Sequence, residues 1–172
     1  NIIEFGTSFG ISTIYLAAAV QDNGGGRVIG SEIEPGKHAR AVANLAAAGL
    51  NQVTEIRLGD AMQTLRNING PVDLVFMDGW KALYLPLLKQ LQPVLRPGAI
   101  VLADNILSFR SNLVEFLDYL QSGRNGFHSV TLRFGDGLEY AVRLAQHEES
   151  GPGSAVSPVH AFTGERSCSA TS

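Results

Sequence analysis

Asp78-Gly79-Trp80-Lys81 and, further along, Asp104-Asn105 each directly follow a run of mostly apolar residues. These runs, Val72 to Met77 and Ala99 to Ala103, have the length and composition of buried strands. The carboxyl ends of parallel strands meet at one edge of a sheet, and that edge is where open α/β sheets bind their ligands. We therefore expect two carboxylates, one amide oxygen and a lysine amine to converge there.

Asp78, Asp104 and Asn105 form a candidate metal site. Carboxylate and amide oxygens are hard donors, and they suit Mg²⁺ or Ca²⁺ better than zinc. Lys81 lies beside them, and a nearby dication lowers the pKa of a lysine from its free value of ~10.4. The sequence thus predicts proton chemistry next to a bound ion, with Lys81 as the base.

Signals for strands and helices alternate along the chain. Strands are expected at 1–5, 27–32, 53–58, 71–77 and 100–103, and helices at 12–20, 35–48, 61–67, 83–95 and 112–120. Arg96-Pro97-Gly98 is expected to close the fourth helix. Two further strands, 127–134 and 138–144, flank Gly135-Asp136-Gly137, which is a hairpin signal. With right-handed crossovers, this order predicts an α/β fold: a doubly wound, Rossmann-like, mostly parallel sheet that ends in an antiparallel hairpin strand.

Composition is that of one globular domain. The chain has 172 residues, of which 45% are hydrophobic and 17% are charged, and its net charge is -3. This net charge gives no indication of a basic surface for nucleic acid. The sequence contains no run of eighteen apolar residues, so we expect no membrane span. The single cysteine, Cys168, excludes an internal disulfide and is compatible with a reducing compartment. We expect a cytoplasmic protein, monomeric or homodimeric, with no nucleic-acid or membrane partner.

The two ends of the chain differ from its middle. Residue 1 is Asn and the first residues already read as a core strand, so we expect an N-terminal portion to be missing. From about residue 145 the periodicity stops, and Gly, Ser and Pro dominate. We predict a domain over residues 1–144 and a disordered tail over residues 145–172.

A glycine-bearing turn joins the first strand to the first helix. Its pattern is E-x-G-x-x-x-G, from Glu4 to Gly10, and not the G-x-G-x-x-G fingerprint of dinucleotide sites. Glu32 ends the second strand, where an acid can accept both ribose hydroxyls of a nucleoside. Asp60 follows the third strand, where it can cap a helix or meet an adenine amino group. Tight turns and solvated acids are the alternative interpretation of these residues.

Taken together, the three strand ends predict a pocket for an adenosine. We expect no lysine or arginine in it to hold a phosphate, and S-adenosylmethionine is an adenosine ligand without phosphates.

At this point the sequence resembles the class I S-adenosylmethionine-dependent methyltransferases, and within them the metal-dependent catechol O-methyltransferase family. The resemblance runs from Asn1 to about Leu144. It is carried by four segments in this order: Ile3-Glu4-Phe5-Gly6 with Gly10-Ile11-Ser12, Asp78-Gly79-Trp80-Lys81 with Tyr84-Leu85-Pro86, Leu102-Ala103-Asp104-Asn105, and Asp136-Gly137-Leu138-Glu139.

The resemblance implies a role for each matching residue. Asp78, Asp104 and Asn105 match Mg²⁺ ligands, Lys81 matches the catalytic lysine, and Glu139 matches an acid that accepts a hydrogen bond from the second hydroxyl of a catechol. The expected cofactor-binding residues are Glu4, Gly6, Ser8, Ser12, Glu32, Ile33, Asp60, Ala61, Asp78 and Trp80. Two of these roles have a structural alternative, since Trp80 could serve packing and Glu139 could face solvent.

The sequence therefore predicts a Mg²⁺-dependent O-methyltransferase that uses S-adenosylmethionine and acts on a small catechol-like phenol. Three other hypotheses stay open. The acceptor could be a caffeoyl thioester or a hydroxylated natural product, the protein could be a nucleotide-dependent oxidoreductase, or it could bind adenosine without turnover. The spacing of the glycines argues against the oxidoreductase.

Overall fold

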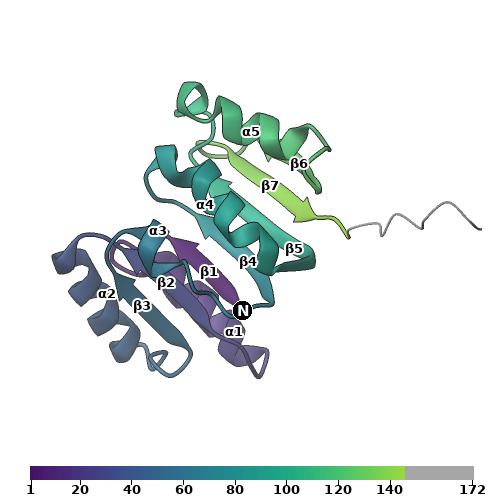
Figure 1. The fold of residues 1–172 in the computed structure, drawn as a ribbon. Coiled ribbons are helices and arrows are strands. Elements are labelled where there is room, and N and C mark those ends of the chain that lie inside the picture. The colour runs from purple at the N-terminus through teal and green to yellow at the C-terminus, as the bar shows by residue number, and fades with distance from the viewer. Residues whose placement is uncertain (146–172) are drawn as a thin grey trace, which may run out of the picture.

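The first strand of the chain lies near the middle of a seven-stranded sheet (Figure 1). The computed structural model describes residues 1–145, and the predicted tail lies outside the described residues from residue 146 on, together with Cys168. The strands, in chain order, are β1 (Ile2–Phe5), β2 (Val28–Glu32), β3 (Thr54–Leu58), β4 (Val72–Met77), β5 (Leu95–Asp104), β6 (Phe127–Leu132) and β7 (Leu138–Arg143). The α-helices are α1 (Ile11–Asp22), α2 (Pro35–Ala47), α3 (Ala61–Thr64), α4 (Tyr84–Leu91) and α5 (Val114–Gln121). Short 3₁₀ turns cover Lys81–Leu83, Gln92–Val94 and Arg110–Asn112.

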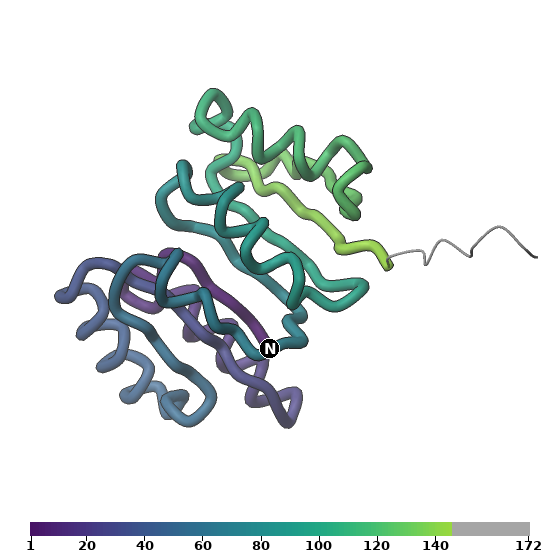
Figure 2. The backbone as a smooth tube through the Cα atoms, viewed as in Figure 1, coloured from purple at the N-terminus to yellow at the C-terminus, as the bar shows by residue number. Residues whose placement is uncertain are grey.

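The order of strands across the sheet is β3-β2-β1-β4-β5-β7-β6. The first five strands pair in parallel, whereas β7 pairs antiparallel with both β5 and β6. Figure 2 shows the path: the chain starts in the centre, builds one half of the sheet, and then crosses to build the other half. The predicted fold class, a doubly wound parallel sheet with an antiparallel hairpin strand, is confirmed.

Helices cover both faces of the sheet, and each face has its own apolar core. The core that includes Ala17, Val20 and Leu45 joins α1 and α2 to the sheet. The larger core joins α4 and α5 to the central strands, and Tyr84 and Phe116 are among its largest buried side chains. Their rings meet edge to face, with centroids 5.3 Å apart. The polar strand ends thus project from a sheet that is packed against helices on both faces.

The region between the fourth and fifth strands differs from the prediction. The expected helix 83–95 ends at Leu91, because Pro93 lacks the N–H that a helix interior requires. The expected turn Arg96-Pro97-Gly98 belongs instead to the first part of β5. A register shift against β4 accommodates this segment, and regular pairing starts at Ile100, where the sequence predicts the strand.

The helix after β3 is also shorter than predicted, since α3 ends at Thr64 rather than at residue 67. In the part of the chain that the structure describes, no helix combines the length and the apolar content needed to span a bilayer.

Candidate functional site

Strand register places the predicted site residues along one edge of the sheet. Met77 pairs with Ala103, so the residues that follow them, Asp78 and Asp104, lie side by side at the edge of the sheet. On its other side, Met77 pairs with Phe5 of β1, which brings the turn after β1 against Asp78. Phe5 in turn pairs with Ser31, the neighbour of Glu32. Four strands therefore deliver their carboxyl ends to one place, as the sequence predicts.

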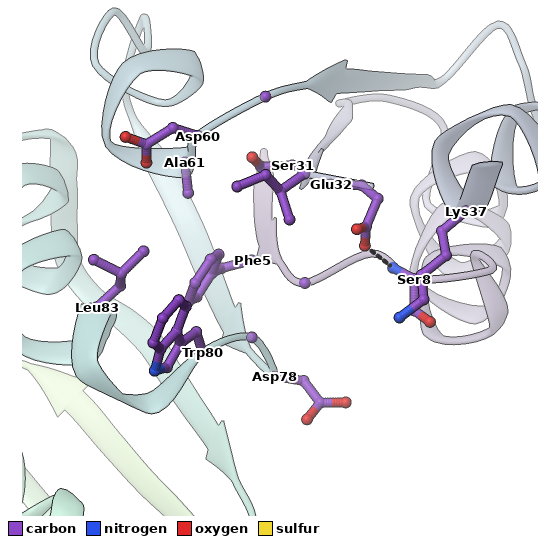
Figure 3. A pocket seen from close by; sticks show the side chains of 14 residues that line it. Phe5, Ser8, Ser31, Glu32, Lys37, Asp60, Ala61, Asp78, Trp80 and Leu83 are labelled. Carbon is purple, nitrogen blue, oxygen red and sulfur yellow. Dashed lines mark hydrogen bonds between the residues drawn. The ribbon is translucent and has the colours of Figure 1, made fainter. Parts of the chain in front are cut away.

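A cavity of about 380 Å³ opens at this edge, and its size suits a small organic ligand (Figure 3). Asp60, Ala61, Leu83 and Trp80 lie on one side of it, and Glu32, Ser8 and Lys37 lie on the other. Of the predicted cofactor-binding residues, those that line this cavity are Gly6, Ser8, Glu32, Ile33, Asp60, Ala61, Asp78 and Trp80.

Glu32 is nearly buried, and backbone N–H groups hold both of its carboxylate oxygens. Oε2 accepts a hydrogen bond from the N–H of Ser8 at 2.7 Å, and Oε1 accepts one from the N–H of Glu34 at 2.9 Å. Ser8 adopts a left-handed backbone, with φ of 52°, which turns its N–H toward this carboxylate. A carboxylate oxygen can accept a second hydrogen bond, so Glu32 keeps the capacity to bind ribose hydroxyls.

Gly6 is required by the close approach of two loops. Its φ is +91°, and a Cβ built there would lie 2.6 Å from the carbonyl oxygen of Asp78. Only glycine combines this backbone conformation with this contact. The turn after β1 can therefore lie directly against the loop after β4, and both loops line the same cavity.

The far side of the cavity carries an acid and an exposed aromatic ring. The side chain of Asp60 caps α3, because it accepts a hydrogen bond from the N–H of Met62 at 2.9 Å. It also lines the cavity, so the capping and ligand interpretations of Asp60 are compatible. Trp80 is 77% exposed, which excludes a packing role in the core and leaves its ring available at the cavity wall.

Lys37 corrects one expectation from the sequence, which was a pocket without lysine or arginine. It lies in the first turn of α2 and lines the cavity beside Ser8 (Figure 3). Its amine lies 5.9 Å from the centre of the Phe9 ring, a cation–π contact. The sequence contains a signal that could have revealed this lysine. Lys37 occupies an early position of the helix that follows Glu32, and that helix starts at the ligand-binding edge of the sheet.

A second cavity, of about 400 Å³, adjoins the first and shares Gly6, Ser8 and Asp78 with it. Asp104 and Ser12 line this second cavity, so the structure brings the two predicted metal-binding carboxylates to one space. Glu4 lies beneath it and is fully buried. Its carboxylate accepts hydrogen bonds from Ser12 at 2.6 Å, from Thr7 at 2.9 Å and from Thr13, so it holds the turn from below.

Lys81 joins the ends of β4 and β5. Its Nζ donates to Oδ1 of Asn105 at 3.1 Å and to the hydroxyl of Tyr84 at 2.6 Å, and it lies 3.7 Å from Oδ1 of Asp78. Asn105 adopts a left-handed backbone, with φ of 61°, which asparagine tolerates better than most residues. The N–H of Asn105 also donates to Oδ1 of Asp104 at 2.7 Å. The predicted base and the three predicted metal ligands thus form one connected group.

The electrostatics of this group are unusual for its residue types. Burial raises the pKa of Asp78 above its usual value, and the neighbouring carboxylates of Asp104 and Glu4 add to the rise, while Lys81 opposes it. Burial also lowers the pKa of Lys81 below the ordinary value of lysine, against the raising effect of Asp78 and Asp104. Acids close together, beside a largely covered amine with a lowered pKa, are typical of a site for chemistry.

The oxygens of Asp78, Asp104 and Asn105 fit a divalent cation such as Mg²⁺. Within residues 1–145, no group of three His, Cys, Asp or Glu side chains could hold a metal, and this set supplies two acids and one amide. After burial, the carboxylates of Asp104 and Glu4 also raise the pKa of Asp78, and a bound cation would relieve this repulsion. Hard oxygen donors of this kind are those that Mg²⁺ binds in proteins, with water filling the other positions.

Glu139 lies on β7, opposite Ala103 of β5, and is fully buried. Its carboxylate accepts hydrogen bonds from the hydroxyl of Thr131 at 2.5 Å and from the amide of Gln121 at 3.0 Å. The alternative that Glu139 faces solvent is therefore wrong. Neither Gln121 nor Thr131 was predicted. Thr131 lies opposite Glu139 in the pairing of β6 with β7, so the predicted hairpin is the signal that could have revealed it, whereas the contact of Gln121 depends on the packing of α5.

The fold and this edge together define the class of protein: a Rossmann-like domain whose cavity suits a nucleoside-containing ligand. Residues 3–106 match the family model described as a methyltransferase domain. The chain belongs to the class I S-adenosylmethionine-dependent methyltransferases, and within them it is similar to the catechol O-methyltransferases.

Individual relatives agree with this membership. The catechol O-methyltransferase of Niastella koreensis is 37% identical over 111 residues, which cover 62% of this chain and 49% of that protein. That of Mus musculus is 31% identical over 172 residues, which cover 92% of this chain and 60% of that protein. The chain thus spans about half the length of the curated relatives it matches.

Solved structures show the same fold. The O-methyltransferase TomG from Streptomyces achromogenes, involved in tomaymycin synthesis and solved in complex with S-adenosylmethionine, superimposes with a TM-score of 0.75. It is 27% identical, and the match covers 84% of this chain and 73% of that one.

Proposed function

We propose that this protein is an O-methyltransferase that transfers a methyl group from S-adenosylmethionine to a hydroxyl of a small catechol-like phenol, with the help of Mg²⁺. One observation carries the proposal. The amine of Lys81 lies within 3.7 Å of Asp78 and 3.1 Å of Asn105, and the cavity lined by Asp78 continues into the one lined by Glu32. A base and an oxygen-rich cation site thus adjoin a nucleoside pocket.

The first cavity supports binding of the adenosine half of the cofactor. Glu32 is held in place to accept the ribose hydroxyls, and Asp60 offers its second carboxylate oxygen to an adenine amino group. The exposed ring of Trp80 and the side chain of Ile33 supply apolar surface for a flat base. Ser12 lines the second cavity, where its hydroxyl would meet the amino-acid end. Bound S-adenosylmethionine would supply an electrophilic methyl group.

The residues at the ends of β4 and β5 support activation of the acceptor. A divalent ion held by Asp78, Asp104 and Asn105 would supply positive charge that favours an ionised phenol. Lys81 would take the proton from the attacking hydroxyl, and burial has already lowered the pKa of its amine toward a useful range. Glu139 lines neither cavity and both of its carboxylate oxygens accept hydrogen bonds from Thr131 and Gln121, so its contact with the acceptor stays a prediction from the resemblance.

Titration calorimetry on the 172-residue chain tests the proposal directly. We expect binding of S-adenosylmethionine and of its demethylated product, no binding of NAD, and a separate heat for Mg²⁺. Methyl transfer is then measured with 3,4-dihydroxybenzoate as acceptor, with and without EDTA. Binding of NAD instead of S-adenosylmethionine would favour an oxidoreductase and contradict the proposal.

A second acceptor class, the hydroxylated natural products, is favoured by the similarity to TomG, which is involved in tomaymycin synthesis. The same cofactor pocket and the same base would serve such a substrate. Comparing turnover of a simple catechol with that of a larger ortho-dihydroxy aromatic compound separates the two. Cofactor binding without turnover on any acceptor would indicate a binding module. A cytoplasmic location and a monomeric or homodimeric state stay predictions.

A further inference from the structure

Tyr84 is the most completely buried polar neighbour of Lys81, and its hydroxyl has two strong hydrogen bonds. It donates to the carbonyl oxygen of Met77 at 2.7 Å and accepts from Nζ of Lys81 at 2.6 Å. The carbonyl of Met77 can only accept, so the single proton of the phenol points toward it. A lone pair of the phenol oxygen is therefore left for the lysine amine, and the direction of this hydrogen bond is fixed.

The ring of Tyr84 is held as firmly as its hydroxyl. It is fully buried in the core under the sheet, with edge-to-face contacts to Phe116 at 5.3 Å and to Phe5 at 6.2 Å between centroids. Phe5 belongs to β1 and Phe116 to α5, so two elements from different parts of the chain fix the position of this oxygen. A side chain that is itself immobile can hold a flexible lysine in place.

The geometry around Lys81 shows what this hydrogen bond could do. An amine nitrogen has four tetrahedral positions, and one is the bond to its own side chain. The contacts to Tyr84 and Asn105 occupy two more. The fourth is left for the side of Asp78, whose Oδ1 lies 3.7 Å away, too far for a good hydrogen bond. The amine also lies 5.6 Å from the centre of the Phe109 ring, and among the neighbours of Lys81 it is Asp78 that lines both cavities.

We propose that Tyr84 is a positioning residue for Lys81: its hydroxyl aims the amine at the space between Asp78 and Asn105 where the acceptor hydroxyl would lie. This inference rests on the proposed function. In the proton transfer, the O–H bond of the acceptor breaks and an N–H bond forms on Lys81. Tyr84 touches neither the acceptor nor the cofactor, and it acts only through the lysine.

Tyr84→Phe tests the inference, because it removes the hydroxyl and keeps the buried ring, including the contact between that ring and the lysine amine at 4.7 Å. Tyr119→Phe is the matched control. The hydroxyl of Tyr119 donates to Gln92 at 2.7 Å, beyond the other end of α4, and has no part in the site. Both variants remove a tyrosine hydroxyl on the same side of the sheet. Tyr84→Phe loses the bonds to Lys81 and Met77 and a longer one to Asp104 at 3.4 Å, whereas Tyr119→Phe loses the bond to Gln92.

The first readout is the rate at which an amine-reactive acetylating reagent labels Lys81 in the full chain, measured by mass spectrometry without cofactor, metal or acceptor. Lys37 and Lys89 serve as internal references. The side chain of Lys81 is only 10% exposed. In Tyr84→Phe we expect its labelling to rise about tenfold (1.4 kcal/mol) relative to those two lysines, and not in Tyr119→Phe. Equal labelling of Lys81 in both variants overturns the inference.

The second readout is turnover under the conditions of the proposed reaction. A misplaced base should lower kcat by about tenfold to a hundredfold and leave KM for S-adenosylmethionine unchanged. If the protein turns over and Tyr84→Phe has an unchanged kcat, the inference is wrong. If the unaltered protein transfers no methyl group at all, the proposed function fails, and the labelling alone decides whether Tyr84 positions Lys81.

A measurement on the unaltered chain covers the case in which Tyr84→Phe does not fold. With ¹⁵N-labelled lysine, NMR should detect a nuclear Overhauser effect between the Lys81 side chain and the ring protons next to the Tyr84 hydroxyl, because Nζ and that oxygen are 2.6 Å apart. Absence of this effect, when Lys89 shows the equivalent contact with the Tyr119 ring at 5.2 Å, would overturn the inference.

Discussion

Nζ of Lys81 lies 3.1 Å from the side-chain oxygen of Asn105, although 24 residues separate them in the sequence. The hydrogen bond spans the gap between two parallel strands, because Lys81 follows β4 and Asn105 follows β5. It orients the amide so that its oxygen faces the site. The same oxygen retains a second lone pair, so holding the lysine and binding a cation are compatible roles for Asn105.

Replacing Asp104 by Asn should weaken the metal site without disturbing the fold. One of the two carboxylates in the second cavity is lost, so we expect Mg²⁺ affinity to fall at least ~10-fold and metal-dependent turnover to be abolished. Calorimetry measures the affinity, and thermal unfolding checks the fold. Asp118→Asn, which removes an exposed acid from α5, is the control and should change neither. Full methyl transfer in EDTA would contradict the role of the metal.

Replacing Glu32 by Ala should weaken binding of S-adenosylmethionine. The variant loses the acceptor for the ribose hydroxyls and frees the N–H groups of Ser8 and Glu34. A lost hydrogen bond to a charged group costs about 1.5–3 kcal/mol, or roughly 10- to 150-fold in Kd. Calorimetry with the demethylated product gives the value. Glu115→Ala, at an exposed position of α5, is the matched control. An unaltered Kd in Glu32→Ala would remove Glu32 from the site.

Many residues at the ligand-binding edge of the sheet could be predicted from the sequence. The order and spacing of the apolar runs show where each parallel strand ends. Apolar runs place Glu32, Asp78 and Asp104 at the ends of their strands, and pairing register then brings them together. The hairpin is equally local, since turn residues and alternation determine it. These features depend on properties that a short window of residues contains.

Contacts between distant segments could not be predicted in the same way. The cation–π contact of Lys37 with Phe9 and the bond from Gln121 to Glu139 depend on how helices pack on the sheet. The end of α4 was missed for a different reason. Apolar periodicity continues to Leu95 and hides the effect of Pro93, so the periodic signal outweighed the helix-breaking one.

Replacing Gly6 by Ala should destabilise the protein more than the same change at Gly24. Both glycines have positive φ, +91° and +77°, so both variants carry backbone strain of about 1–2 kcal/mol. A Cβ at Gly6 also meets the carbonyl oxygen of Asp78 at 2.6 Å, whereas one at Gly24 has no atom within 4 Å. Urea unfolding measures the difference. Equal losses in the two variants would show that the loops after β1 and β4 are not in close contact.

Replacing Lys81 by Arg tests whether Lys81 acts as a base or only supplies a positive charge. Arginine keeps the positive charge beside Asp78, but its guanidinium does not give up a proton at any working pH. If Lys81 is the base, kcat should fall ~10²–10⁴-fold, the usual contribution of general base catalysis. Lys89→Arg, on the exposed side of α4, is the control and should keep its activity. The comparison is made at pH 7 with saturating cofactor, Mg²⁺ and acceptor.

The pH profile of kcat tests whether the neutral amine of Lys81 is the active form. Burial lowers the pKa of Lys81, and only the neutral amine can accept a proton, so activity should rise with pH through that lowered pKa. The rising limb therefore lies below the ordinary pKa of lysine. In Lys81→Arg this limb should disappear, and activity should recover only where the phenol ionises without a base. A variant with near-normal kcat at pH 7 and the same rising limb would show that another group takes the proton.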